Sequence, residues 1–396
     1  MSVKTRGNRM WRFLLCCVLL AVQSGCWSQH EIESLSMYVG IALDLPEQSP
    51  LEKELGRKGT VPGRQEILTL TMQIVSPQAG RKGEGQTTFR QYINVKSTGD
   101  SIFKTLREFA LTRERPIIAH HLKVIVIGDK LIRKYGLDQL LNMFLKDNDI
   151  RPSTLIFVSK GNAAETLAGH GSEDIPSFRV AGLLRNRFRN MKILPPVTLI
   201  KVQGKMVQPS SFLLQNVVSA DNDLKLSGAA VIDGKTLKLR GFLNEDELGA
   251  VSIITSETRG GYIKTSIDGQ PLTYEVTSIK SKIKPHYEKG AVSFAIDVQT
   301  KGRLMEDWAE PDKPLTNTRR NELEEAVKRE ITQSVGKTMR KLQQDYRTDA
   351  VGFGKRMEIV YPKLWKTLKK DWDETFAEAD VEVNVNAEIV DIGSSM

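Results

Sequence analysis

The chain has 396 residues, and its formal charge of +9 arises from 57 basic and 48 acidic side chains. Charges of both signs are mixed along the whole chain, which excludes the concentrated basic surface of a nucleic-acid-binding protein. Of the three cysteines, Cys16 and Cys17 lie close to the start, so a chain that loses this start keeps Cys26 as its only thiol. That count excludes a disulfide framework and a cysteine metal site in the remaining chain.

Residues 1–25 predict a signal peptide, because basic residues precede an apolar stretch at 13–22 that is too short to span a bilayer. Gln23, Ser24 and Gly25 then lead into Cys26, which resembles a bacterial lipobox in which Gln23 replaces the common Leu. We therefore expect cleavage before Cys26 and a diacylglyceryl group with an amide-linked acyl chain on this residue, which together give stable anchoring. An ordinary secretory signal followed by a chance cysteine is the alternative. No other cofactor is expected.

Residues 26–196 are predicted to form an N-terminal α/β domain. Asp100 is expected to cap a helix, and Gly136 to end the first of the helices over 129–146. Pro195 and Pro196 close a basic stretch and mark the domain boundary. Apolar alternation or continuous apolar runs predict five strands, at 38–44, 67–75, 89–95, 122–127 and 155–159.

Residues 197–305 are expected to form a strand-rich middle domain. A hairpin of 224–232 and 236–242 surrounds Asp233 and Gly234, a pair suited to a type I′ turn. Residues 306–396 are expected to form a C-terminal domain with helices on a sheet. A second amphipathic helix begins after Pro362, and a final strand alternates over 381–389. The longest helix has charged residues such as Glu324 and Lys341 on one side, and on the other an apolar stripe of Leu323, Val327, Ile331, Val335, Met339, Leu342 and Tyr346.

The predicted fold class is therefore mixed α/β (α+β), with three domains in series, each a sheet packed with helices. No phosphate-binding loop, nucleophile elbow or metal-binding histidine pair occurs in the sequence. Adjacent residues on a strand face opposite ways, so His120 and His121 are not expected to share a metal. The acids at 245–247 are interpreted as the start of a helix, where negative charge is stabilising, and not as a catalytic carboxylate cluster. We expect a solvated face from the basic stretch of Arg185, Arg187, Arg189 and Lys192, and core packing from Trp365 and Trp372.

Several motifs resemble the Ger(x)C lipoproteins, the third subunit of bacterial spore germinant receptors. Cys26 and Trp27 resemble the family's start, although Ser28 stands where Asp is usual. The run from His121 to Gly128 is similar to the family's most specific strand, and a segment ending at Arg151 follows it.

The second half of the chain carries further motifs of the same family. Gly241 to Glu247 resembles the middle region, although Phe242 replaces the usual Trp, Leu248 replaces Thr, and no Arg precedes Gly249. Residues 322–344, 352–354, Trp365 and Trp372 resemble the carboxyl region.

The resemblance implies an anchored subunit in the outer leaflet of the spore inner membrane, without catalytic activity, that assembles with A- and B-type integral membrane subunits and serves the response to nutrient germinants. It implies lipid attachment at Cys26 and structural or interface roles for Trp27, His121, Gly128, Arg151, Gly241, Glu247, Trp365 and Trp372. A solute-binding lipoprotein of a membrane transporter is the main alternative, and a lipid-anchored cell-wall enzyme is the third.

Overall fold

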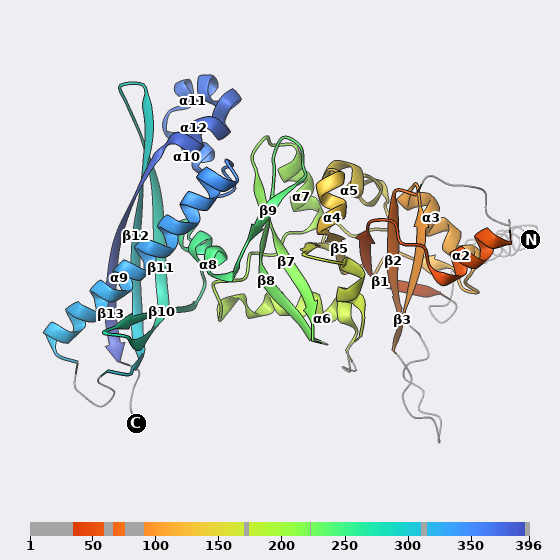
Figure 1. The fold of residues 1–396 in the computed structure, drawn as a ribbon, viewed down its shortest axis with the longest axis horizontal. Helices are drawn as coiled ribbons and strands as arrows, with labels where there is room; N and C mark the ends of the chain where they lie inside the picture. Colours follow the sequence, from red (N-terminus) through yellow and green to blue (C-terminus); the bar gives the residue numbers. More distant parts are fainter. Residues whose placement is uncertain are drawn as a thin grey trace, which may run out of the picture.

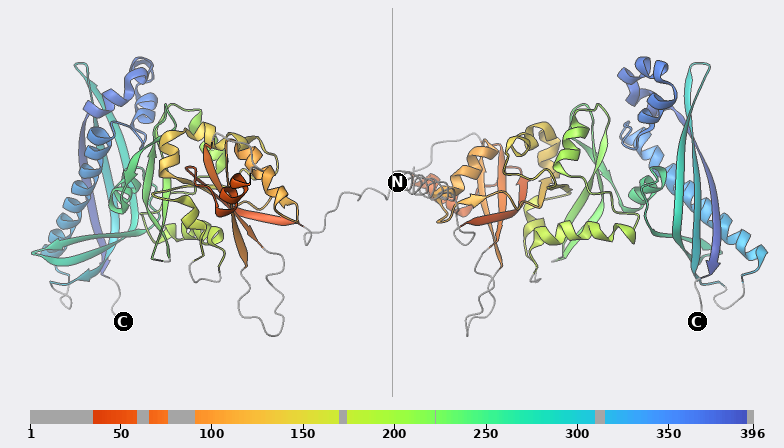
Figure 2. Two further views of the ribbon diagram at one scale, coloured as in Figure 1. Left: turned by 45° about the vertical axis from the view of Figure 1, so that its right-hand side comes forward. Right: turned by 180° about the vertical axis from the view of Figure 1, so that it is seen from behind.

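The computed structural model describes residues 35–58, 66–75, 91–169, 174–221, 223–309 and 315–392. The predicted leader, Cys26 and Trp27 lie outside these ranges. The described chain is elongated, with one sheet near the amino terminus, a second sheet at the opposite end, and a group of strands between them (Figure 1). The same serial arrangement is visible from two further directions (Figure 2). Within the described ranges, no helix combines the length and apolar character needed to cross a bilayer.

The N-terminal sheet mixes antiparallel and parallel pairs. β2 pairs with β1 and β3 in antiparallel fashion, whereas β4 and β5 lie parallel to β1, and β6 lies parallel to β5. Every residue of β5 is buried, as the continuous apolar run predicts for a central strand. The strands are β1 (Ser36–Asp44), β2 (Leu68–Val75), β3 (Tyr92–Gly99), β4 (Ile117–Ile118), β5 (Val124–Gly128) and β6 (Leu155–Ser159).

The alternation at 67–75 predicts a strand with one buried face, but both faces of β2 are buried. On its polar face, Gln73 contacts the 3-10 helix η3 (Ala163–Leu167) and helix α6 (Pro176–Leu183). Gln73 donates from Nε2 to the carbonyl of Leu167 at 2.7 Å and accepts at Oε1 from the N–H of Ser177 at 2.9 Å. A polar side chain with such partners is buried at little cost in free energy. The alternation of polar and apolar residues therefore did not predict that η3 and α6 cover the polar face of β2.

Two helix boundaries in this region differ from the sequence prediction. Ser101, and not Asp100, caps α3, because its hydroxyl accepts from the N–H of Lys104. Gly136 stands at the start of α5, and α4 ends before it at Lys134. The helices of this half are α2 (Pro50–Arg57), α3 (Ile102–Glu108), α4 (Asp129–Lys134), α5 (Leu137–Lys146), α6 and α7 (Leu199–Met206).

The middle strands β7 (Phe212–Ala220), β8 (Asp223–Ile232) and β9 (Leu239–Leu243) form an antiparallel group. β7 pairs in parallel with β6 at Val158 and Asn216, so the middle strands extend the N-terminal sheet in the order β3-β2-β1-β5-β6-β7-β8-β9. The hairpin of β8 and β9 is confirmed.

The predicted type I′ turn between β8 and β9 is wrong. The connection is longer than two residues, and Leu237, at φ 56°, is its positive-φ residue. The carboxylate of Asp233 accepts from the N–H groups of Lys235 and Thr236, which supports this longer turn. Asp268 and Gly269, with φ of 50° and 78°, instead make the tight turn between β10 and β11.

The C-terminal sheet has the order β10-β11-β12-β13. Its strands are β10 (Gly261–Ile267), β11 (Gln270–Glu288), β12 (Ala291–Asp307) and β13 (Asp380–Ile392), and β13 runs parallel to β12. The strands expected in the middle domain therefore divide, because β10, β11 and β12 belong to the same sheet as β13. The predicted boundary at 305 falls inside β12. The remaining domain boundaries stay predictions.

Helix α9 (Asn317–Arg340) packs its apolar stripe toward this sheet, as predicted, and continues into a π-helical turn, η5 (Lys341–Asp345). The shorter helices are α8 (Glu245–Ile254), α10 (Phe353–Val360), α11 (Pro362–Leu368) and α12 (Trp372–Glu378). The predicted second amphipathic helix is thus interrupted between α11 and α12. The mixed α/β fold with helices packed on sheets is confirmed.

Candidate functional site: the junction of the middle strands and the C-terminal helices

The end of β9 packs against the residues that follow α9. The hydroxyl of Tyr346 donates to the carbonyl of Phe242 at 2.8 Å, and the Tyr346 carbonyl accepts from Arg240 Nε at 3.2 Å. A Cβ on Gly241 would lie 2.5 Å from ring atoms of Tyr346. Glycine at 241 therefore lets an aromatic ring cross the strand, which gives this motif residue a steric role at the junction.

Glu247 connects α8 to the end of α9. Its carboxylate accepts from the N–H of Asn244 at 2.7 Å, while the Asn244 side chain accepts from the N–H of Glu247 at 2.9 Å, so the pair forms a capping box. The two carboxylate oxygens also accept from Lys341 Nζ at 2.7 and 3.0 Å. The prediction that the acids at 245–247 begin a helix is confirmed.

Lys341, predicted on the charged side of the long helix, is only partly exposed because it binds Glu247. Burial alone would lower the pKa of Lys341, but the hydrogen bond to Glu247 and its negative charge raise that pKa above its ordinary value. Glu324, predicted on the same side, accepts from the N–H of Ile389 in β13 at 2.8 Å. These two charged residues therefore bind other elements of the fold.

The loop before α10 is organised around the buried carboxylate of Asp349. Its two oxygens accept from the backbone N–H groups of residues 351–354 at 2.6–3.1 Å and from Trp372 Nε1 at 3.0 Å. Because the first N–H groups of a helix have no partner inside it, Asp349 satisfies the start of α10 and ties it to α12. Gly352 adopts φ 94° in this loop.

Trp365 and Trp372 pack into the core beside this loop, as predicted. Their ring centroids lie 5.0 Å apart with an edge-to-face geometry. A Cβ on Gly354 would lie 2.7 Å from Trp372 Nε1 and 2.9 Å from the Trp365 ring. The motif residues of the second half thus surround one region, from β9 through η5 to α12.

In the first half, Gly128 and Asp44 meet where parallel strands end. A Cβ on Gly128 would lie 2.3 Å from Asp44 Oδ1. The Asp44 carboxylate accepts from the N–H groups of Ala163 and Ala164 at 2.7 and 2.9 Å. Burial raises the pKa of Asp44 to about 6, although these N–H donors lower it. Gly128 therefore provides space for a carboxylate that caps η3.

His121 and Arg151 lie apart from Gly128, and both are exposed. The histidine pair occupies a turn before β5 and not a strand, which corrects the geometry assumed from the sequence. Burial, Arg151 and Lys123 lower the pKa of His121. His120 Nε2 lies 3.6 Å from a carboxylate oxygen of Asp149. Across the described ranges, no group of three or more potential ligands is arranged to hold a metal.

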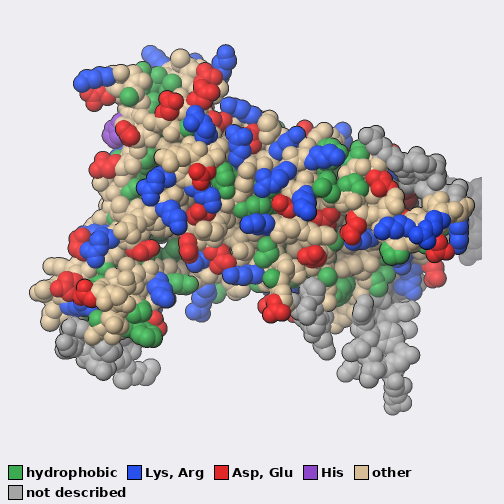
Figure 3. All heavy atoms as spheres, viewed as in Figure 1, with side chains coloured by type: hydrophobic (Ala, Val, Ile, Leu, Met, Phe, Trp, Pro, Cys, Tyr) green, Lys and Arg blue, Asp and Glu red, His purple; other side chains and the backbone are tan. Residues whose placement is uncertain are grey.

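The basic stretch at 185–192 is only partly a solvated face. Arg187 donates to the carbonyl of Glu257, and Lys192 Nζ binds the Asp246 carboxylate at 2.7 Å. These contacts link the segment after α6 to α8. On the face shown in Figure 3, basic and acidic side chains are interspersed, as the composition predicts.

The sequence does not predict the roles of Tyr346, Lys341 and Asp349 at the junction. Asn244 and Glu247 carry a local signal, the capping-box spacing, that identifies the start of α8. The contacts of Tyr346 and Lys341 reach β9 and α8 about a hundred positions away, and no local pattern reports them.

Comparisons with known proteins give one consistent result. A family model described as "Spore germination protein N-terminal domain" matches residues 28–218, and one described as "Spore germination B3/ GerAC like, C-terminal" matches residues 227–393. Spore germination protein YndF of Bacillus subtilis (strain 168) is 38% identical over 389 residues, which cover 96% of both chains. Spore germination protein B3 of the same organism is 30% identical and covers 97% of this chain and 98% of its own.

A solved structure shows that this chain is similar to a known protein in fold as well as in sequence. The crystal structure of the GerBC protein matches with a TM-score of 0.61 and 29% identity, covering 82% of this chain and 94% of that chain. Two family models, relatives matched nearly end to end and this structure agree. The chain belongs to the Ger(x)C family of spore germination proteins.

Proposed function

We propose that this chain is the lipid-anchored subunit of a spore germinant receptor and acts without catalysis, as an assembly component for integral membrane subunits. The observation that carries the proposal is the extent of the match. Relatives named spore germination proteins B3, A3 and KC are matched over 98%, 98% and 93% of their own lengths. The whole chain, and not one module of it, is therefore shared with them.

The junction supports an assembly role. Side-chain contacts of Tyr346, Glu247 and Asp349 connect the middle strands, α8 and the C-terminal helices. Such contacts hold the C-terminal sheet in a defined orientation, which a docking surface requires. A lipid on Cys26 would confine the chain and its membrane partners to the plane of the spore inner membrane, and confinement raises their effective concentration.

The test is a pull-down of the lipidated protein from dormant spore inner membrane, with the co-purifying proteins identified. We expect A- and B-type integral membrane subunits with the wild type and far less of them with Cys26→Ala, while the thermal unfolding of the protein is unchanged. Gln23→Leu, which restores the common lipobox residue, is the matched control and should behave as wild type. Permease and ATPase subunits in their place would favour the transporter alternative. Normal assembly and germination with Cys26→Ala would refute the role of the anchor.

A further inference from the structure

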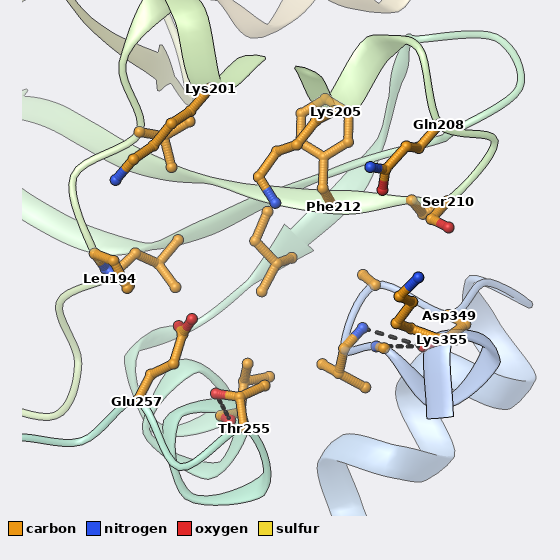
Figure 4. A pocket seen from close by; sticks show the side chains of 18 of the residues that line it. Leu194, Lys201, Lys205, Gln208, Ser210, Phe212, Thr255, Glu257, Asp349 and Lys355 are labelled. Atoms are coloured by element: carbon orange, nitrogen blue, oxygen red, sulfur yellow. Dashed lines mark hydrogen bonds between the residues drawn. The ribbon is translucent and has the colours of Figure 1, made fainter. Parts of the chain in front are cut away.

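The junction contains a cavity of about 490 Å³, a volume typical of small-molecule sites. Three parts of the chain line it. The segment from 194 through α7 to the start of β7 forms one side, the end of α8 forms a second, and the Asp349 loop with Lys355 forms the third. Figure 4 shows these parts facing one another, with Lys205 and Phe212 opposite Glu257 and Thr255. An occupant would touch the middle strands and the C-terminal helices at once.

Lysine side chains supply most of the charge in this cavity, and two of the three have partners. Lys201 Nζ donates to the carbonyl of Pro196 at 2.9 Å, and Lys355 Nζ binds the Glu358 carboxylate at 2.8 Å. The ammonium of Lys205 has no hydrogen-bond or ion-pair partner among the residues that the structure describes. It lies 5.5 Å from the centre of the Phe212 ring.

Lys205 is therefore a partly buried cation without a hydrogen-bond or ion-pair partner among the described residues. Burial lowers the pKa of Lys205, while the negative charge of Glu257 opposes this effect. Two acids line the cavity. The Asp349 carboxylate already accepts from the Gly354 N–H and Trp372 Nε1, so Glu257 is the acid that balances the charge of Lys205. A partly buried ammonium in this situation gains from a bound anion more than a fully exposed lysine does.

The rest of the lining is largely apolar. The apolar lining includes Leu194, Val197, Phe212, Leu213 and Val251. A bare inorganic anion would leave this surface without contacts, whereas a ligand with an apolar body would cover it. The lining thus matches a charged group at one end of the ligand and an apolar group at the other.

We propose that this cavity binds a small organic anion, such as a monocarboxylate with an aromatic or branched body, whose charged group pairs with Lys205 and whose body packs against Phe212, Leu213 and Val251. Binding stabilises the junction, because the ligand contacts α7, α8 and the loop before α10 together.

The test is isothermal titration of the full mature chain with benzoate, benzamide and inorganic phosphate. Benzoate should bind, and benzamide, which has the same shape without the charge, should bind at least tenfold more weakly. Lys205→Met should weaken benzoate binding by about tenfold or more, as expected for the loss of a charged hydrogen bond. Lys130→Met, on the exposed side of α4, is the matched control and should leave binding unchanged.

Glu257→Gln provides a second variant that keeps Lys205 in place and should tighten benzoate binding by removing the competing charge. Benzoate should also raise the thermal unfolding temperature of the wild type but not that of Lys205→Met. Equal benzoate affinity in the wild type and Lys205→Met, or no heat of binding at millimolar benzoate, would overturn the proposal. Phosphate binding as tight as that of benzoate would overturn the assignment of an apolar body.

Discussion

The Asp349 carboxylate provides the sharpest test of how the C-terminal helices are held together. In Asp349→Asn, the side-chain oxygen can still accept from the N–H groups of residues 351–353. The amide nitrogen then replaces Oδ2 and points its hydrogens at two other donors, the Gly354 N–H and Trp372 Nε1, which lie 2.6 and 3.0 Å from Oδ2. Each buried donor without an acceptor costs about 1–3 kcal/mol, so the free energy of unfolding should fall by about 2–6 kcal/mol.

The measurement is urea unfolding followed by near-ultraviolet circular dichroism, because Trp365 and Trp372 both report on this region. Asp373→Asn is the matched control, since the Asp373 carboxylate binds Lys235 at 2.9 Å near the surface and should contribute no more than about 1 kcal/mol. A free energy of unfolding for Asp349→Asn within about 0.5 kcal/mol of the wild type would refute the reasoning, because two buried donors without acceptors should destabilise the fold by more than this.

Three further predictions concern the junction and the N-terminal sheet. Gly241→Ala places a Cβ 2.5 Å from the Tyr346 ring and should cost about 1–3 kcal/mol in urea unfolding, whereas a substitution without effect would show that the ring moves freely. Glu247→Gln removes the charge that binds Lys341 and should speed hydrogen exchange at residues 341–346; unchanged exchange would contradict the link between α8 and α9. The pKa of Asp44 is raised to about 6 by burial, so the folded state favours its protonated form, and wild-type stability should fall as pH rises from about 4 to 6. Asp44→Asn should flatten that dependence in the same unfolding assay, and an equal slope in both proteins would exclude Asp44 as its source.

The spacing of apolar residues and the continuous apolar runs predicted most strands and the long helix correctly. The alternation at 381–389 became β13, and the stripe from Leu323 to Leu342 became the buried side of α9. These predictions succeed because burial on one face imposes a spacing that the residues record locally.

The turn between β8 and β9 shows where local reasoning fails. Asp233 followed by Gly234 has the composition of a type I′ turn, but the Asp233 carboxylate binds N–H groups within the loop and stabilises a longer connection. The same dipeptide at 268–269 does make a tight turn, and both strands beside it pair up to its edge. Strand register, which is a tertiary property, decides between the two outcomes.

The junction was beyond local prediction for a different reason. Gly241 and Glu247 could be identified as motif residues, but their partners Tyr346 and Lys341 lie about a hundred positions further along the chain. Among these residues, the capping box of Asn244 and Glu247 is encoded by neighbours in sequence. The rest depends on how α9 crosses the ends of β9 and α8.

The parallel pairing of β12 with β13 also affects how the protein is made. All of α9 to α12 lies between these two strands in the sequence, so one edge of β12 stays unpaired until the last strand has been synthesised. Exposed edges of this length pair readily with other chains. A chain that ends before residue 380 would therefore expose this edge and tend to aggregate. Synthesis of the last strand is what protects the sheet from pairing with other chains.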